Sequence, residues 1–147
     1  MENRHQGVVL SEKLWSKCVQ TVLEILDHSH AEISVVFVDD EEISLLNRAY
    51  LDRDGPTNVI AFPMREGEAS DVTPELLGDV VISLDTAIRE AENAGIPWRE
   101  RLLALLIHGL LHLLGYDHID DVERGRQMER EEARVFELAV IGCSALE

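Results

Sequence analysis

The chain has 147 residues, enough for one domain with a single hydrophobic core, and its 46% hydrophobic and 29% charged residues argue against a disordered protein. Aspartate and glutamate outnumber lysine and arginine by 29 to 13. The resulting net charge of −16 disfavours a protein that coats nucleic acid through its overall field, although it leaves room for a local basic patch. No apolar run approaches the ~18 residues of a membrane span, so we expect a soluble protein without a membrane partner.

The cysteine content and the N-terminus bear on the compartment. The two cysteines, Cys18 and Cys143, form no Cys-x-x-Cys pair, so we expect neither a disulfide framework nor a thiolate metal site. The first residues lack the charged-then-apolar pattern of a signal peptide. We therefore expect a protein of a reducing compartment.

Helical and strand patterns follow one another along the whole chain, and no linker or repeat divides it. In chain order, the spacing of the apolar residues predicts a helix from the N-cap Ser11 to Leu26, a strand over 33–38, a helix capped at Asp39 and running through Ala49, a strand over 59–62 that Pro63 ends, a strand over 80–82, a helix over 85–93, a helix over 98–114 and a helix over about 120–139. Residues 64–77 are polar and irregular, so we expect a loop there.

Two of these segments are apolar on every side. The strand over 80–82 has no polar residue, so we expect it at the centre of its sheet. Residues 102–107 are likewise all apolar, so the helix that contains them should be buried between the sheet and other helices. Strands scattered among helices without strict alternation indicate a single α+β domain over residues 1–147, with a small mixed sheet packed by several helices around that buried helix.

The C-terminal end of the buried helix carries three histidines. His108 and His112 are four residues apart, which places them on one helical face, about 6 Å apart along the axis. Gly115 is a helix-stop signal that lets the chain turn back and return His118 to the same point. Three neutral imidazoles with a fourth position open are typical of a catalytic zinc site. We therefore predict one zinc ion per chain, bound by His108, His112 and His118.

The spacing of this motif, His-x3-His-x2-Gly-x2-His, is that of the metzincin proteases with one change. The glutamate that acts there as general base is replaced by Gly109, which weakens the alternative of a metalloprotease-like hydrolase. Without that glutamate, the chemistry must rely on the metal, which either lowers the pKa of its bound water toward ~7 or polarises a phosphoryl oxygen so that the 2′-OH of the RNA can attack. The other three histidines, His5, His28 and His30, belong to no such motif, and we expect them at the surface.

Three segments in chain order form a longer pattern. Residues 54–63 are Asp-Gly-Pro-Thr-Asn-Val-Ile-Ala-Phe-Pro, residues 78–83 are Gly-Asp-Val-Val-Ile-Ser, and residues 108–118 are His-Gly-Leu-Leu-His-Leu-Leu-Gly-Tyr-Asp-His. Together with Asn47 and Tyr50, these segments resemble the signature blocks of the YbeY family, the bacterial metal-dependent endoribonucleases.

The resemblance implies a zinc-dependent, single-strand-specific endoribonuclease that acts in the cytoplasm in small-subunit (16S) rRNA 3′ end maturation and in ribosome quality control. It implies that His108, His112 and His118 hold the zinc. It also implies ribosomal RNA and the small ribosomal subunit as partners, with ribosomal proteins and a ribosome-assembly GTPase as further ones.

The chain departs from the family after the tyrosine, where Leu51 stands in place of an arginine. Arg53 is the preferred candidate to contact phosphate instead, ahead of Arg48 and Arg65. Asp117 either orients a ligating imidazole or forms a turn. We name Arg53 and Asp117 as candidate catalytic residues. The departure also keeps open a second alternative, a ribosome-associated factor with a structural zinc and little turnover.

Overall fold

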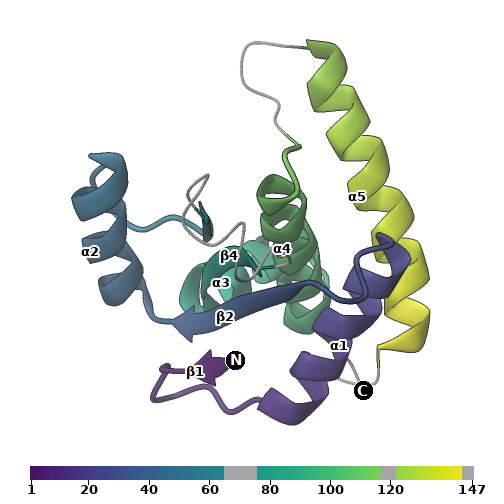
Figure 1. Cartoon of the computed structure of the whole chain (residues 1–147). Helices are drawn as coiled ribbons and strands as arrows, with labels where there is room; N and C mark the ends of the chain where they lie inside the picture. Colours follow the sequence, from purple (N-terminus) through teal and green to yellow (C-terminus); the bar gives the residue numbers. More distant parts are fainter. Residues whose placement is uncertain (65–75, 117–121, 144–147) are drawn as a thin grey trace.

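The computed structural model describes residues 1–64, 76–116 and 122–143. Its helices and strands confirm the α+β expectation (Figure 1). In chain order they are β1 (Glu2–Asn3), α1 (Glu12–Ile25), β2 (Glu32–Val38), α2 (Asp40–Leu51), β3 (Val59–Pro63), β4 (Leu76–Ser83), α3 (Leu84–Ala94), α4 (Trp98–Leu113) and α5 (Val122–Gly142). All the predicted helices and strands are present, some with shifted bounds, and the two-residue strand β1 is an addition.

The sheet is mixed, as expected, with the strand order β1-β2-β4-β3. Strands β1, β2 and β4 run parallel, whereas β3 is antiparallel to β4. The two faces of β4 contact different cores. Val80 and Ile82 belong to the main core with α1, α3, α4 and α5, whereas Val81 packs with Ile43 of α2. The main core therefore lies on one face of the sheet, and α2 covers the other.

Helix α4 runs through the main core, as predicted for the apolar segment. It packs against β3 and β4 on one side and against α3 and α5 on others. Six of its side chains are fully buried, namely Leu102, Leu103, Leu106, Ile107, Leu110 and Leu111. This packing fixes the rotation of α4, and with it the direction in which its polar residues point. Among the described residues, no helix combines the length and the apolar character that a membrane span requires.

A disulfide joins Cys18 of α1 to Cys143, the residue after α5, so the expectation of no disulfide is wrong. The two cysteines are 125 residues apart in the sequence, and only the packing of α1 beside α5 brings their Cα atoms to 5.2 Å. Both cysteines are buried in the main core. The expectation of a reducing compartment rested partly on unpaired cysteines and loses that support.

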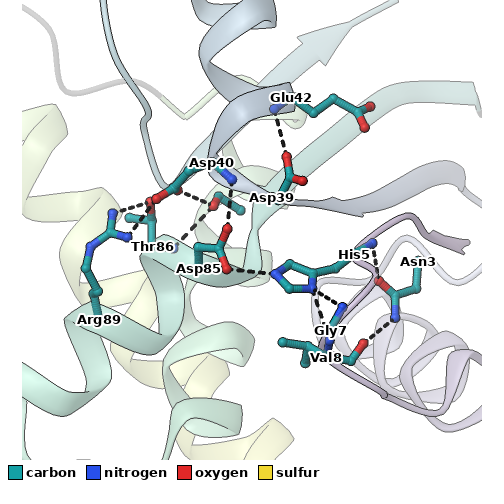
Figure 2. A network of polar contacts seen from close by, with 11 residues as sticks. Asn3, His5, Gly7, Val8, Asp39, Asp40, Glu42, Asp85, Thr86 and Arg89 are labelled. Carbon is teal, nitrogen blue, oxygen red and sulfur yellow. Dashed lines mark hydrogen bonds and ion pairs between the residues drawn. The ribbon is translucent and has the colours of Figure 1, made fainter.

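The starts of α2 and α3 are bound to each other by a polar network (Figure 2). The Asp40 carboxylate accepts hydrogen bonds from the hydroxyls of Ser83 (2.7 Å) and Thr86 (2.6 Å) and from the guanidinium of Arg89 (2.7 Å). Burial raises the pKa of Asp40, but these hydrogen bonds outweigh it and hold that pKa below its usual value. Asp85 in turn accepts from the backbone N–H of Asp40 (3.0 Å).

His5 belongs to the same network, so the expectation of a surface residue is wrong for it (Figure 2). Its Nε2 lies 2.7 Å from a carboxylate oxygen of Asp85, its Nδ1 accepts from the backbone N–H groups of Gly7 and Val8, and its side chain is only 12% exposed. The partner Asp85 is 80 residues away in the sequence, which hides the contact from sequence patterns. The same expectation is confirmed for the two exposed histidines at positions 28 and 30.

Candidate metal centre

His108 and His112 lie on one face of the last turns of α4, as their spacing predicts. Their Nε2 atoms are 3.1 Å apart, and the two rings meet edge to face with centroids 4.6 Å apart. Both residues are half-buried, whereas the residues around them on the helix are packed into the core. The sequence-predicted pair is therefore assembled on a rigid element, with its Nε2 atoms 3.1 Å apart.

The donor set of this pair fits zinc. Tetrahedral zinc binds imidazole nitrogens at about 2.0–2.1 Å, which puts two such nitrogens about 3.3–3.4 Å apart. The observed 3.1 Å between the Nε2 atoms of His108 and His112 is within a few tenths of an ångström of that separation. Neutral imidazole is also among the ligands that zinc prefers. The two histidines can thus occupy neighbouring corners of a zinc tetrahedron with little movement.

A third residue, Glu132 of the neighbouring helix α5, contacts His108. Its Oε1 lies 2.6 Å from Nδ1 of His108, the ring nitrogen that points away from His112. Sequence analysis did not identify Glu132, which is 24 residues beyond His108 and on a different helix. The signal that could have found it is helical spacing, because Glu132 lies one turn after the buried Met128.

Gly115 ends the helix after His108 and His112, as the sequence predicts. Gly115 has a φ of 98°, a left-handed conformation that glycine adopts readily, and its N–H donates to the carbonyl of His112 (3.0 Å). His118 and Asp117 lie outside the described residues, so the third ligand and the orienting aspartate stay predictions. Within the described residues, no group of three or more histidine, cysteine, aspartate or glutamate side chains is placed to hold a metal ion.

The residue between the two histidines explains the departure from the protease motif. Gly109 faces the sheet, and a Cβ atom built there would lie 2.8 Å from Val80 Cγ1 and 3.3 Å from Val59 Cγ2. A side chain fits this position only if the side chain of Val80 or the strand that carries it shifts. The glutamate of the metzincin motif would therefore be forced into the apolar core instead of beside a metal.

Arg53 lies at the other predicted part of the site, just after α2. The helix ends at Leu51, and Asp52 adopts the left-handed conformation with a φ of 52°. Within a continuing helix Arg53 would lie about 200° around the axis from position 51. Because the helix has already ended, Arg53 does not continue that rotation and can take the place of an arginine at position 51. Its backbone N–H donates to the Asn47 carbonyl (3.3 Å), and its side chain is exposed.

Arg48, a second candidate for the phosphate contact, already has ion-pair partners. Arg48 pairs with Asp54 at 2.9 Å and lies 3.8 Å from Asp52. The described part of the chain offers Arg53 no ion pair, and no hydrogen bond joins its side chain to the histidine pair. The third candidate, Arg65, lies outside the described residues.

Two further residues of the family pattern, Gly78 and Asn47, hold neighbouring segments of the fold together. Gly78 has a φ of 136°, and a Cβ atom there would come within 2.2 Å of the carbonyl oxygen of Phe62, so β3 and β4 can pair closely only with glycine at this position. The buried Asn47 donates from its side chain to the carbonyl of Gly55 (3.0 Å), which ties α2 to the turn before β3.

Comparisons with known proteins agree with this pattern. A family model described as Endoribonuclease YbeY matches residues 1–139. Over 137 residues the chain is 47% identical to the Endoribonuclease YbeY of Syntrophotalea carbinolica and 46% identical to that of Geobacter sulfurreducens, and each alignment covers 92% of this chain and 91% of the relative. The solution structure of a Thermotoga maritima protein superposes with a TM-score of 0.67 at 24% identity, covering 99% of this chain and 93% of that one, and so shares the fold.

Proposed function

The chain belongs to the YbeY family of endoribonucleases, and on that premise we propose that it is a zinc-dependent enzyme that cleaves single-stranded RNA. Its proposed biological substrate is the 3′ end of the small-subunit (16S) ribosomal RNA, in maturation and in ribosome quality control in the cytoplasm. The proposed partners are the small ribosomal subunit and, beyond it, ribosomal proteins and a ribosome-assembly GTPase.

One observation carries the metal part of this proposal, the 3.1 Å approach of the Nε2 atoms of His108 and His112. We propose that these two residues and His118 hold one zinc ion per chain. A bound zinc ion supplies a Lewis acid that stabilises negative charge on a phosphoryl group. Because the buried apolar side chains of α4 fix its position, the two imidazoles need little reorganisation to bind the ion.

The other proposed roles belong to charged side chains. Arg53, exposed after the end of α2, contacts the phosphate of the substrate and offsets the charge that develops during cleavage. Asp117 orients one of the ligating imidazoles. Position 109 has no room for a carboxylate, so these roles do not include a general base beside His108.

The experiment that tests this function offers the zinc-loaded protein an RNA single strand, the same strand in a perfect duplex, and casein. We expect the single strand to be cleaved at least about tenfold faster than the duplex, because a chain of net charge −16 has little field to hold a duplex. Equal rates on the two RNAs would contradict the proposal. Casein cleavage would favour the protease alternative, and tight zinc binding without RNA cleavage would favour the structural-zinc alternative.

Arg53→Ala is expected to lower the rate of RNA cleavage by about tenfold or more, equivalent to about 1.4 kcal/mol of lost transition-state stabilisation. Arg48→Ala is the matched control, because Arg48 is already paired with Asp54 and should matter less. Leu51→Arg should raise the rate or leave it unchanged at constant zinc content. A silent Arg53→Ala together with a strongly activating Leu51→Arg would show that Arg53 does not replace the family arginine.

A further inference from the structure

We infer that Glu132 is a positioning residue that selects the tautomer of His108 in which Nε2 carries the lone pair that can bind a metal. The inference rests on the metal part of the proposed function. It starts from the 2.6 Å contact between Glu132 Oε1 and His108 Nδ1. A neutral imidazole carries one N–H, and an ionised carboxylate accepts hydrogen bonds but has no proton to donate. A neutral His108 ring can therefore make this contact only with its proton on Nδ1 and its lone pair on Nε2.

The two tautomers of His108 differ in what they present at the 3.1 Å contact with Nε2 of His112. With its proton on Nε2, His108 would donate across this contact and would have no lone pair there for a metal. With its proton on Nδ1, Nε2 of His108 accepts from Nε2–H of His112 in the metal-free protein, so only His112 has to change tautomer before both Nε2 atoms can bind an ion. Glu132 thus favours the arrangement in which the His108 lone pair lies on the side of His112.

Helix α5 holds Glu132 in place by its own packing. Met128 and Val135, four residues before and three residues after Glu132, share its helical face and are 1% and 0% exposed within the main core. The side chain of Glu132 is 31% exposed, so its carboxylate lies at the edge of this core beside α4. An anchored backbone and a short hydrogen bond together limit the rotation of the His108 ring.

The adjacent Glu131 provides a matched control. Its carboxylate accepts hydrogen bonds from both Nε and Nη2 of Arg134 on the same helix, and the Arg134 guanidinium holds the pKa of Glu131 below its usual value. Glu131 and Glu132 thus have the same side chain on the same helical turn, but only Glu132 contacts a histidine in the described structure. The effect on net charge is shared by the two positions, whereas an effect through His108 is not.

The first measurement uses the metal-free protein with ¹⁵N-labelled histidine, in which nitrogen chemical shifts report the tautomer of each ring. We expect a proton on Nδ1 of His108 in the native protein and in Glu131→Met. In Glu132→Met, which keeps the chain length but removes the acceptor, we expect that preference to be lost. An unchanged His108 tautomer in Glu132→Met would overturn the inference. This readout needs neither zinc nor RNA, so it stands apart from the proposed function.

The second measurement is zinc affinity, by competition with a chromophoric chelator. We expect Glu132→Met to bind zinc ~10–100-fold more weakly than the native protein, the usual effect of losing such a partner, and Glu131→Met to bind as the native protein does. Glu132→Gln keeps an acceptor oxygen and should retain part of the affinity, which separates positioning from misfolding. Native affinity in a folded Glu132→Met would contradict the inference. A native protein that binds no zinc would instead contradict the proposed function.

Discussion

Replacing His112 by alanine should abolish zinc binding and lower RNA cleavage by at least about 100-fold, because the proposed three-imidazole site loses a ligand from a rigid helix. His108→Ala should have the same effect, since its Nε2 lies 3.1 Å from that of His112. The measurements are metal content per chain and the rate of cleavage of a single-stranded RNA. The exposed His28 and His30 are the controls, and their alanine variants should keep both zinc and activity.

The same metal analysis tests the predicted third ligand. His118→Ala should lose the zinc as completely as the two helical variants do. If any two of the variants His108→Ala, His112→Ala and His118→Ala keep one zinc per chain, the three-ligand site is wrong.

Gly109→Glu, which restores the glutamate of the protease motif, is expected to unfold the protein rather than to activate it. The new side chain would start 2.8 Å from a methyl group of Val80, and its carboxylate would lie without a partner in the main core. Burying such a group costs several kcal/mol, out of a total stability of about 5–15 kcal/mol for an ordinary domain. Thermal and denaturant unfolding measure the loss, and a folded variant of native stability would contradict the packing described here.

A smaller substitution isolates the steric part of that effect. Gly109→Ala gains about 1 kcal/mol of helix propensity, but overpacking costs about 1–3 kcal/mol, so we expect a net loss of stability. In a Val80→Ala background the contact at 2.8 Å is gone, and the same substitution should become stabilising. A double-mutant cycle with no coupling between positions 80 and 109 would show that the strand does not exclude a side chain at Gly109.

Local patterns sufficed to predict most of the fold. The side chains of Ser11 and Asp39 accept hydrogen bonds from the backbone three residues on, as their predicted roles as N-caps require. The all-apolar strand at residues 80–82 is central in the sheet, as predicted. These features depend on neighbours within one helical turn or on simple periodicity, which a sequence displays directly.

The features that the sequence did not reveal depend on partners far along the chain. Glu132 is placed beside His108 by α5, and the disulfide forms because α1 packs against α5. His5 is held by a contact with Asp85 at the start of α3. In the same way, Gly109 was recognised as a departure from the protease motif, but its cause is the approach of Val80. Such contacts follow from topology, which local spacing does not specify.

We propose that one zinc ion, held by the histidines at the end of α4, makes this chain an active endoribonuclease. Zinc is added in steps to the metal-free protein, and cleavage of a single-stranded RNA is measured at each step. We expect activity to be absent at first, to rise in proportion to the zinc added and to stop rising at one zinc per chain. Full cleavage by the metal-free protein, or zinc binding to saturation without any cleavage, would show that zinc does not have this role.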